Sequence, residues 1–130
     1  MATTTPATRP VCEIGVVDDC ACARVGPGLA SEIQHCYRDW AYSCVAQQCR
    51  CALLVGTSDG DAFPHLAARD AIASIALGGI PGGFRLAVVA ENAAMIMVYD
   101  AVVVTARRHG IDARRFQDEK EAVQWLGGGP

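Results

Sequence analysis

Seven cysteines are the residues of this chain with the widest chemical repertoire, because a thiolate can bind a metal, attack an electrophile or form a disulfide. Two pairs, Cys20 with Cys22 and Cys49 with Cys51, are each separated by one residue. Alternate residues of a strand share a face, so each pair could present two sulfurs together. Zinc sites usually have about two to four intervening residues, which let a turn fold both sulfurs onto one ion. We therefore expect no metal site and no cofactor.

The cysteine count also bears on the compartment. Seven is an odd number, whereas a secreted disulfide framework normally has an even number of cysteines and an export signal. The first ten residues lack the apolar core of a signal peptide. We therefore expect a cytoplasmic protein in which the cysteines, including Cys12, Cys36 and Cys44, are reduced, half-buried structural residues.

Three histidines are the next candidates for chemistry. His109 falls in the last turn of an expected helix, where a partial positive charge suits the helix dipole. His35 precedes Cys36, but neighbours on a helix point in different directions. His65 is adjacent to a polar loop, although a solvated first-turn histidine is the simpler interpretation. Because no converging catalytic partners are evident, we predict that the chain is not an enzyme. A small thiol or hydrolytic enzyme using His65 is the least favoured alternative.

That polar loop follows an apolar run at residues 50–55 and precedes an expected helix. Open α/β sheets bind ligands at the carboxyl ends of their strands, and the exposed amides of a helix start favour anions. We therefore predict that Thr57, Ser58 and Asp59, together with His65, bind a ligand or partner. The plainer alternative is a turn in which Asp61 caps the helix.

Residues 93–107 form a second candidate surface, because this expected helix is apolar almost all the way round. A helix on the surface of a domain needs only about a third of its circumference to be apolar. The excess predicts a dimer face, a partner-binding face or a wall of an apolar ligand cavity, and methionines suit such adaptable surfaces. The residues assigned to this surface are Met95, Met97, Val98, Tyr99 and Val102.

The elements that must position these residues follow from the hydrophobic pattern. Two extended runs around Asp18 and Asp19 predict a hairpin. After it, apolar runs of strand length alternate with segments of helical period, which predicts a mostly parallel sheet with right-handed crossovers. We expect an α/β fold with a mixed sheet of four to five strands, the hairpin at its edge and about four helices. The expected strands are 11–17, 20–25, 50–55, 84–90 and 111–116, and the expected helices are 29–48, 61–77, 93–109 and 118–126.

Length and composition limit the classes of function. The 130 residues suit one domain, at residues 11–127, after a disordered tail at residues 1–10. A net charge of -3 and 6% aromatic residues argue against a nucleic-acid partner. No apolar stretch approaches the ~18 residues of a spanning helix, so we expect no membrane span. The partners that we expect are another protein, a second copy of the chain, or a small apolar or lipid-like ligand.

Three segments carry a resemblance to a known family. Residues 50–55 form an apolar strand before a loop and a helix, and residues 84–89 read Phe-Arg-Leu-Ala-Val-Val. Residues 115–126 combine a phenylalanine, an acidic cap and a Trp-Leu end. In this order the segments resemble the STAS-like domains, specifically the SpoIIAA-like group of small bacterial proteins, over about residues 11–127. The resemblance implies a non-enzymatic regulatory or binding module with a protein partner or an apolar ligand.

The resemblance also implies an alternative function. STAS domains proper are anti-sigma-factor antagonists with a phosphorylatable serine that follows an aspartate at the start of the helix after the central strand. The matching loop here is Gly-Thr-Ser-Asp-Gly-Asp at residues 56–61, which has hydroxyls but lacks the family's Asp-Ser-Ser-Gly pattern. The alternative to a binding module is therefore a phosphoswitch that acts through Thr57 or Ser58.

Overall fold

The computed structural model of the chain describes residues 11–58 and 61–127. The tail expected at residues 1–10 and the predicted site residue Asp59 lie outside these described residues. The elements follow in the order β1 (Cys12–Val17), β2 (Cys20–Val25), α1 (Ala30–Ala46), β3 (Cys51–Gly56), the 3-10 helix η1 (Phe63–Leu66), α2 (Ala67–Leu77), β4 (Arg85–Ala90), α3 (Ala93–Arg108), β5 (Asp112–Phe116) and α4 (Glu119–Leu126).

The five strands form one mixed sheet in the order β1-β2-β3-β4-β5. Strand β1 is antiparallel to β2, whereas β2 to β5 run parallel to one another. Asp18 and Asp19 both have positive φ, at 51° and 65°, and Val17 pairs with Cys20. A two-residue turn with two left-handed residues matches the twist of the strands that it joins. The predicted hairpin, the mostly parallel sheet and the α/β class are thereby confirmed.

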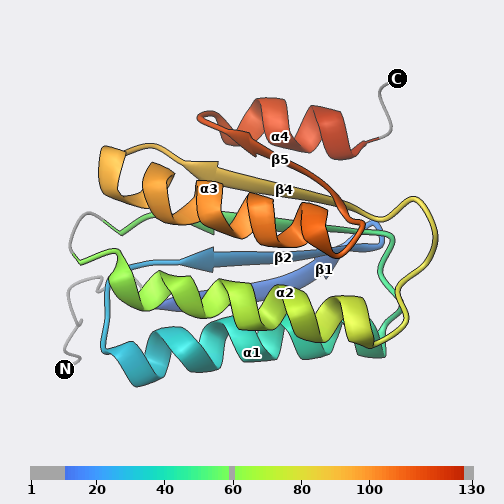
Figure 1. Ribbon diagram of the computed structural model, residues 1–130, viewed down its shortest axis with the longest axis horizontal. Coiled ribbons are helices and arrows are strands. Elements are labelled where there is room, and N and C mark those ends of the chain that lie inside the picture. The colour runs from blue at the N-terminus through green and yellow to red at the C-terminus, as the bar shows by residue number, and fades with distance from the viewer. Residues whose placement is uncertain (1–10, 59–60, 128–130) are drawn as a thin grey trace, which may run out of the picture.

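Helices α1, α2 and α3 lie side by side on one face of the sheet (Figure 1). Because the strand order advances in a single direction, each right-handed crossover returns over the same face. The larger core fills the space between this helix layer and the sheet. Within it, the indole nitrogen of Trp40 donates a hydrogen bond to the carbonyl oxygen of Ala21 at 2.9 Å, which ties α1 to β2. Leu29, the first residue of the helix expected at 29–48, instead precedes α1 and is exposed.

The fourth helix, α4, covers the other face of the sheet over β3, β4 and β5. It buries Ala122 against a smaller core whose other buried members are Cys20, Leu53, Val55, Ala87 and Val89. The rings of Phe116 and Trp125 lie 5.6 Å apart and close the outer side of this core. One short helix therefore covers part of a five-stranded face, and the outward side of the β1–β2 hairpin has less cover than the rest.

Local signals set most helix boundaries. The side chain of Asn92 accepts a hydrogen bond from the backbone of Met95 at the start of α3, and Gly110 adopts a φ of 80° just after its end. Asp118 caps α4 in the same way. The helix expected from residue 61 differs, because η1 precedes α2 there. Asp61 Oδ1 accepts from the backbone nitrogen of Phe63 at 3.1 Å, in the turn that leads into η1. Leu66 occupies the N-cap position of α2, so Asp61 does not cap that helix as predicted.

Cys12 and Cys36 form a disulfide, with their Cα atoms 5.6 Å apart. The expectation that these two cysteines are reduced is therefore wrong. The reason is tertiary: β1 lies against α1, which brings the first residue of the edge strand to the buried face of the helix. The other five cysteines carry free thiols.

Within the two described ranges, none of the helices combines the length and the apolar character that crossing a bilayer requires.

Candidate functional site

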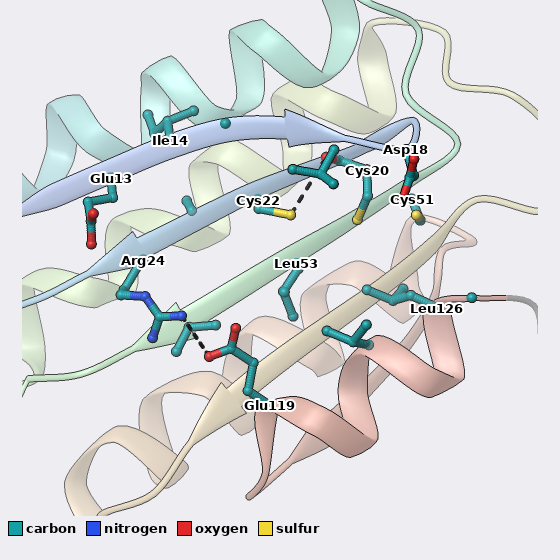
Figure 2. A pocket seen from close by; sticks show the side chains of 16 residues that line it. Glu13, Ile14, Asp18, Cys20, Cys22, Arg24, Cys51, Leu53, Glu119 and Leu126 are labelled. Carbon is teal, nitrogen blue, oxygen red and sulfur yellow. Dashed lines mark hydrogen bonds and ion pairs between the residues drawn. The ribbon is translucent and has the colours of Figure 1, made fainter.

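A groove of about 510 Å³ lies between the β1–β2 hairpin and α4 (Figure 2). Its floor consists of outward-facing side chains of β2 and β3, among them Leu53 and Val55. Val17 of the hairpin and Val123 of α4 line its sides and are 60% and 51% exposed. The volume is that of a small-molecule site, for which about 300–1,000 Å³ is usual.

Gly15 explains why the groove is hollow on the hairpin side. Residues 13, 15 and 17 of β1 alternate with the residues that pack on the larger core, so they face the groove. A Cβ atom built on Gly15 would have no other atom within 4 Å. A side chain at this position would therefore project into open space within the groove.

An ion pair joins the two sides of the groove. Arg24 of β2 donates to Glu119 of α4 at 2.7 Å, and both side chains are more than two-fifths exposed (Figure 2). At the other end of α4, the guanidinium of Arg85 lies over the Trp125 ring and donates to the Trp125 carbonyl at 2.9 Å. These contacts attach both ends of α4 to the sheet. They therefore set the distance between α4 and the hairpin, which is the width of the groove.

Three free thiols lie together in the floor of the groove: Cys20, Cys22 and Cys51 (Figure 2). Cys20 pairs in register with Cys51 across β2 and β3, and Cys22 is the next residue of β2 that lines the groove. As a neutral thiol, Cys22 Sγ donates to the carbonyl oxygen of Cys20 at 3.6 Å. We call these three residues the thiol cluster.

The three thiols of the cluster differ in pKa. A hydrogen bond from the Cys20 side chain stabilises the Cys22 thiolate and lowers the pKa of Cys22 to about 7, against the opposing effects of burial and the Glu119 charge. The same hydrogen bond, together with burial, raises the pKa of Cys20. Burial raises the pKa of Cys51. Cys22 is therefore the thiol of the cluster whose reactive thiolate form is the most favoured.

Sequence spacing grouped the cysteines differently. Cys49 lies before β3 and joins the larger core, where its backbone nitrogen donates to the Cys44 carbonyl oxygen at 3.0 Å. Burial raises the pKa of Cys44 to about 12, so this second pair is inert. In residues 11–58 and 61–127, no group of three or more His, Cys, Asp or Glu side chains is arranged to hold a metal ion. The pattern Cys20-x-Cys22 indicated two thiols on one face, but only the sheet register shows that Cys51 joins them.

A second groove of similar volume lies between α1 and α2. Its lining includes the polar side chains of Gln34, Arg38, Asp70 and Ser74, and none of the sequence-predicted site residues belongs to it.

The predicted polar loop is folded into the protein. The hydroxyl of Thr57 donates to the Val25 carbonyl at 3.4 Å, and the backbone nitrogen of Thr57 donates to the same oxygen at 2.9 Å. The Ser58 side chain is buried, and the Ser58 carbonyl accepts from the side chain of Asn92 at 2.6 Å. The contacts of Thr57 and Ser58 thus link the loop to β2 and to the start of α3.

His65 is fully buried, so the interpretation as a solvated first-turn histidine is wrong. Its Nδ1 lies 2.6 Å from the hydroxyl of Tyr37, which lies 2.8 Å from the hydroxyl of Tyr99. Burial lowers the pKa of His65 to about 4 and raises the pKa values of both tyrosines. The three side chains are therefore neutral at pH 7 and connect η1, α1 and α3. Sequence reasoning did not connect His65 with either tyrosine, because the three residues are far apart along the chain.

The predicted α3 surface is largely internal. Met95, Val98, Tyr99 and Val102 are buried among residues of the same chain, so their assignment to a face between two subunits is corrected. The physical reason is that α3 packs on β4, β5, α2 and η1 at once. These contacts cover more of its circumference than the single face that a surface helix buries. The fifth assigned residue, Met97, is 74% exposed. On the same outer side, Val104 is half exposed and Asp100 is paired with Arg115 at 2.6 Å.

No protein-family model, curated protein or solved structure matches the chain.

Proposed function

We propose that the chain is a non-enzymatic binding module that takes a small apolar, lipid-like ligand in the groove between the β1–β2 hairpin and α4. The observation that carries the proposal is the incomplete cover of the second sheet face by α4, which leaves a groove of ligand size over an apolar floor. The STAS-like resemblance of the sequence supports the same class of function, because it implies a regulatory or binding module.

The lining of the groove favours an elongated apolar ligand with a polar head. Leu53, Val55 and Val123 supply apolar contact along its length. Removing apolar surface from water contributes about 25 cal/mol per Å², so a chain of several methylenes can bind without charged contacts. Arg24 and Glu119 lie at the groove as a partly exposed pair. Together they offer a donor and an acceptor to a polar head group.

The other expected functions receive less support from the geometry. A dimer face on α3 stays a prediction that concerns its exposed residues Met97 and Val104. A phosphoswitch would need a kinase to reach Thr57, whose hydroxyl is hydrogen-bonded to β2, or Ser58, whose side chain is buried. No described contact favours the phosphoswitch over the groove.

A groove-filling substitution tests the proposal. Gly15→Leu adds a side chain where nothing lies within 4 Å, so it should fill the groove without disturbing the fold. Gly82→Leu is the matched control, because Gly82 also has open space around its Cβ position and does not line the groove. The probe is a dansyl-labelled fatty alcohol, an uncharged lipid-like molecule whose emission increases and shifts to the blue on transfer into an apolar site.

We expect saturable binding of the probe by the natural chain, affinity lower by about tenfold or more in Gly15→Leu, and unchanged affinity in Gly82→Leu. Circular dichroism and thermal unfolding confirm that each variant is folded. Absence of saturable binding to the natural chain would refute the proposal. Equal affinity of the natural chain and a folded Gly15→Leu variant would show that the probe binds elsewhere.

A further inference from the structure

Binding of an apolar ligand does not require free thiols, so it does not explain why three of them lie together in the thiol cluster. Three free thiols meet in the groove floor, where Cys22 and Cys51 are partly exposed. The remaining free thiols, Cys44 and Cys49, are both buried in the larger core. The accessible thiols are thus concentrated in one place, on neighbouring positions of β2 and β3.

We propose that Cys20, Cys22 and Cys51 form a thiol–disulfide exchange site that reacts with a small disulfide and closes a Cys20–Cys51 bridge between β2 and β3. The size of the groove favours a low-molecular-weight disulfide over the disulfide of a folded protein, because the thiols lie in its floor. Glu13, Asp18 and Glu119 line the same groove and would disfavour an anionic substrate.

In the first step, the Cys22 thiolate attacks one sulfur of the substrate R–S–S–R. The substrate S–S bond breaks, Cys22 forms a mixed disulfide with one R–S group, and the other leaves as a thiolate that takes a proton from water. In the second step, Cys20 loses its proton to water and attacks Cys22 Sγ, which releases the second R–S group as a thiol. The product of this step is a Cys20–Cys22 disulfide.

In the third step, Cys51 loses its proton and attacks Cys20 Sγ, which expels Cys22 as a thiolate. Cys20 and Cys51 have then been oxidised by two electrons in total, and the substrate has been reduced to two R–SH. No other oxidant is required, because the substrate disulfide accepts both electrons.

Strand geometry decides which bridge is the final product. Alternate residues along a strand are roughly 6.6 Å apart, which is near the upper limit of about 6.8 Å for the Cα atoms of a disulfide. Neighbouring strands are about 4.8 Å apart, which is well inside that range. Cys20 and Cys51 are such register neighbours, so their bridge is the less strained of the two.

The position of Cys20 also supports this order of steps. Cys22 Sγ donates to the Cys20 carbonyl oxygen at 3.6 Å, and Cys51 is the register partner of Cys20 on β3. Cys20 therefore lies next to both other members, so it can attack Cys22 and then be attacked by Cys51. Cys22 is the first to react because its thiolate is populated at neutral pH (its pKa is lowered to about 7), whereas the pKa values of Cys20 and Cys51 are raised.

This inference stands apart from the proposed function, since it depends on the thiols and not on any apolar ligand. Failure of the dansyl-labelled fatty alcohol to bind would leave the exchange site intact. Failure of the thiols to react would leave ligand binding intact.

The experiment incubates the full chain with hydroxyethyl disulfide, a small neutral probe, and with glutathione disulfide as the anionic comparison. Samples are quenched with N-ethylmaleimide and analysed by intact mass and peptide mapping. In the natural chain we expect a mass loss of two hydrogens, a Cys20–Cys51 cross-link and N-ethylmaleimide on Cys22. The neutral probe should react faster than glutathione disulfide.

Three substitutions separate the steps. Cys22→Ser should slow the reaction by about tenfold or more, because burial raises the pKa values of the remaining thiols, Cys20 and Cys51, which leaves them little thiolate at neutral pH. Cys20→Ser should trap the mixed disulfide on Cys22. Cys51→Ser should allow the first two steps without the final cross-link. Cys49→Ser is the matched control in the larger core and should react like the natural chain.

Two results would overturn the proposal. One is a natural chain that forms no disulfide among the three residues after prolonged incubation, which would leave them as structural thiols only. The other is an unchanged rate in Cys22→Ser. If Cys20→Ser fails to fold, rapid quenching of the natural chain replaces it, because the mixed disulfide on Cys22 must then appear before the cross-link.

Discussion

The hydroxyl of Tyr37 lies 2.6 Å from Nδ1 of His65, in the interior of the layer formed by the helices. Tyr37 is on α1 and His65 is on η1, and no solvent reaches either side chain to any extent. The bond therefore holds a neutral imidazole where its protonated form would be poorly solvated. Nε2 of this ring has no hydrogen-bond partner within the described residues, so protonation would add an unpaired charge.

We predict that acid destabilises the protein through His65. Its pKa is about 4 in the folded chain and 6.5 as the reference value, so the unfolded state binds the proton more tightly. The His65 contribution to stability is therefore complete above pH 6.5 and is lost as the pH falls towards 4, by about 3 kcal/mol in total. Urea unfolding at a series of pH values measures this loss.

Other groups titrate in the same range, so the comparison with His65→Gln isolates the effect of the histidine. The variant should be less stable than the natural chain at pH 7 and should lose less stability between pH 6.5 and pH 4. Parallel pH profiles for the natural chain and His65→Gln would contradict this assignment.

We predict that Gly56→Ala destabilises the fold whereas Gly15→Ala does not. A Cβ atom on Gly56 would lie 3.0 Å from the Tyr99 ring and in collision with the methyl end of Met95. Overpacking of this kind costs about 1–3 kcal/mol, since Met95 can move but the buried ring has less freedom. Gly15 has open space at the same position in another strand. The midpoints of urea unfolding compare the two variants, and equal midpoints would show that the Gly56 site can adapt.

We predict that the Cys12–Cys36 disulfide stabilises the protein. The bridge joins two residues that are 24 positions apart in the sequence. A cross-link over a loop of that size lowers the conformational entropy of the unfolded chain, which stabilises the folded state by about 3 kcal/mol. Adding a phosphine reductant should lower the unfolding midpoint of the natural chain. The variant Cys36→Ala should already have the lower midpoint and should respond little to the reductant. A reductant that lowers both midpoints equally would place its target elsewhere.

We predict opposite outcomes for two aspartate substitutions on α3. Val102→Asp places a charge in the larger core without a partner, which should unfold the chain or destabilise it by several kcal/mol. Met97→Asp changes an exposed side chain and should leave stability within about 0.5 kcal/mol. Native mass spectrometry of Met97→Asp then tests the α3 dimer face directly. If the natural chain is dimeric and the folded variant stays dimeric, α3 is not the interface.

Much of the fold could be predicted because its signals are local. The two aspartates at 18 and 19 indicated the hairpin, and they adopt the left-handed turn that a two-residue connection requires. The expected end of a helix at residue 109 and the expected start of the next at residue 118 match the cap residues of α3 and α4. Each signal acts within a few residues of the chain, so it is legible without knowledge of any other segment.

The predicted sites were less accurate, because each prediction depended on whether the side chains are exposed or buried in the folded chain. Met95 and Val102 lie on a strongly apolar helix, but the helical period does not show that α2 and η1 also pack against it. His65 follows a proline in a first turn, which normally lies at the surface, yet Tyr37 and Tyr99 enclose it. The thiol cluster was interpreted as structural, because the spacing of four cysteines could be compared only with metal sites.

The amino-acid sequence by itself determined the order of strands and helices, their approximate ends and the side of each that avoids water, because those properties arise from neighbours along the chain. Tertiary structure decided which distant residues meet. Cys51 joins Cys20 through the register of β2 and β3, Cys12 reaches Cys36 because β1 packs on α1, and the groove exists because α4 covers β3, β4 and β5. These pairings depend on strand order and packing between segments tens of residues apart, which no local periodicity specifies.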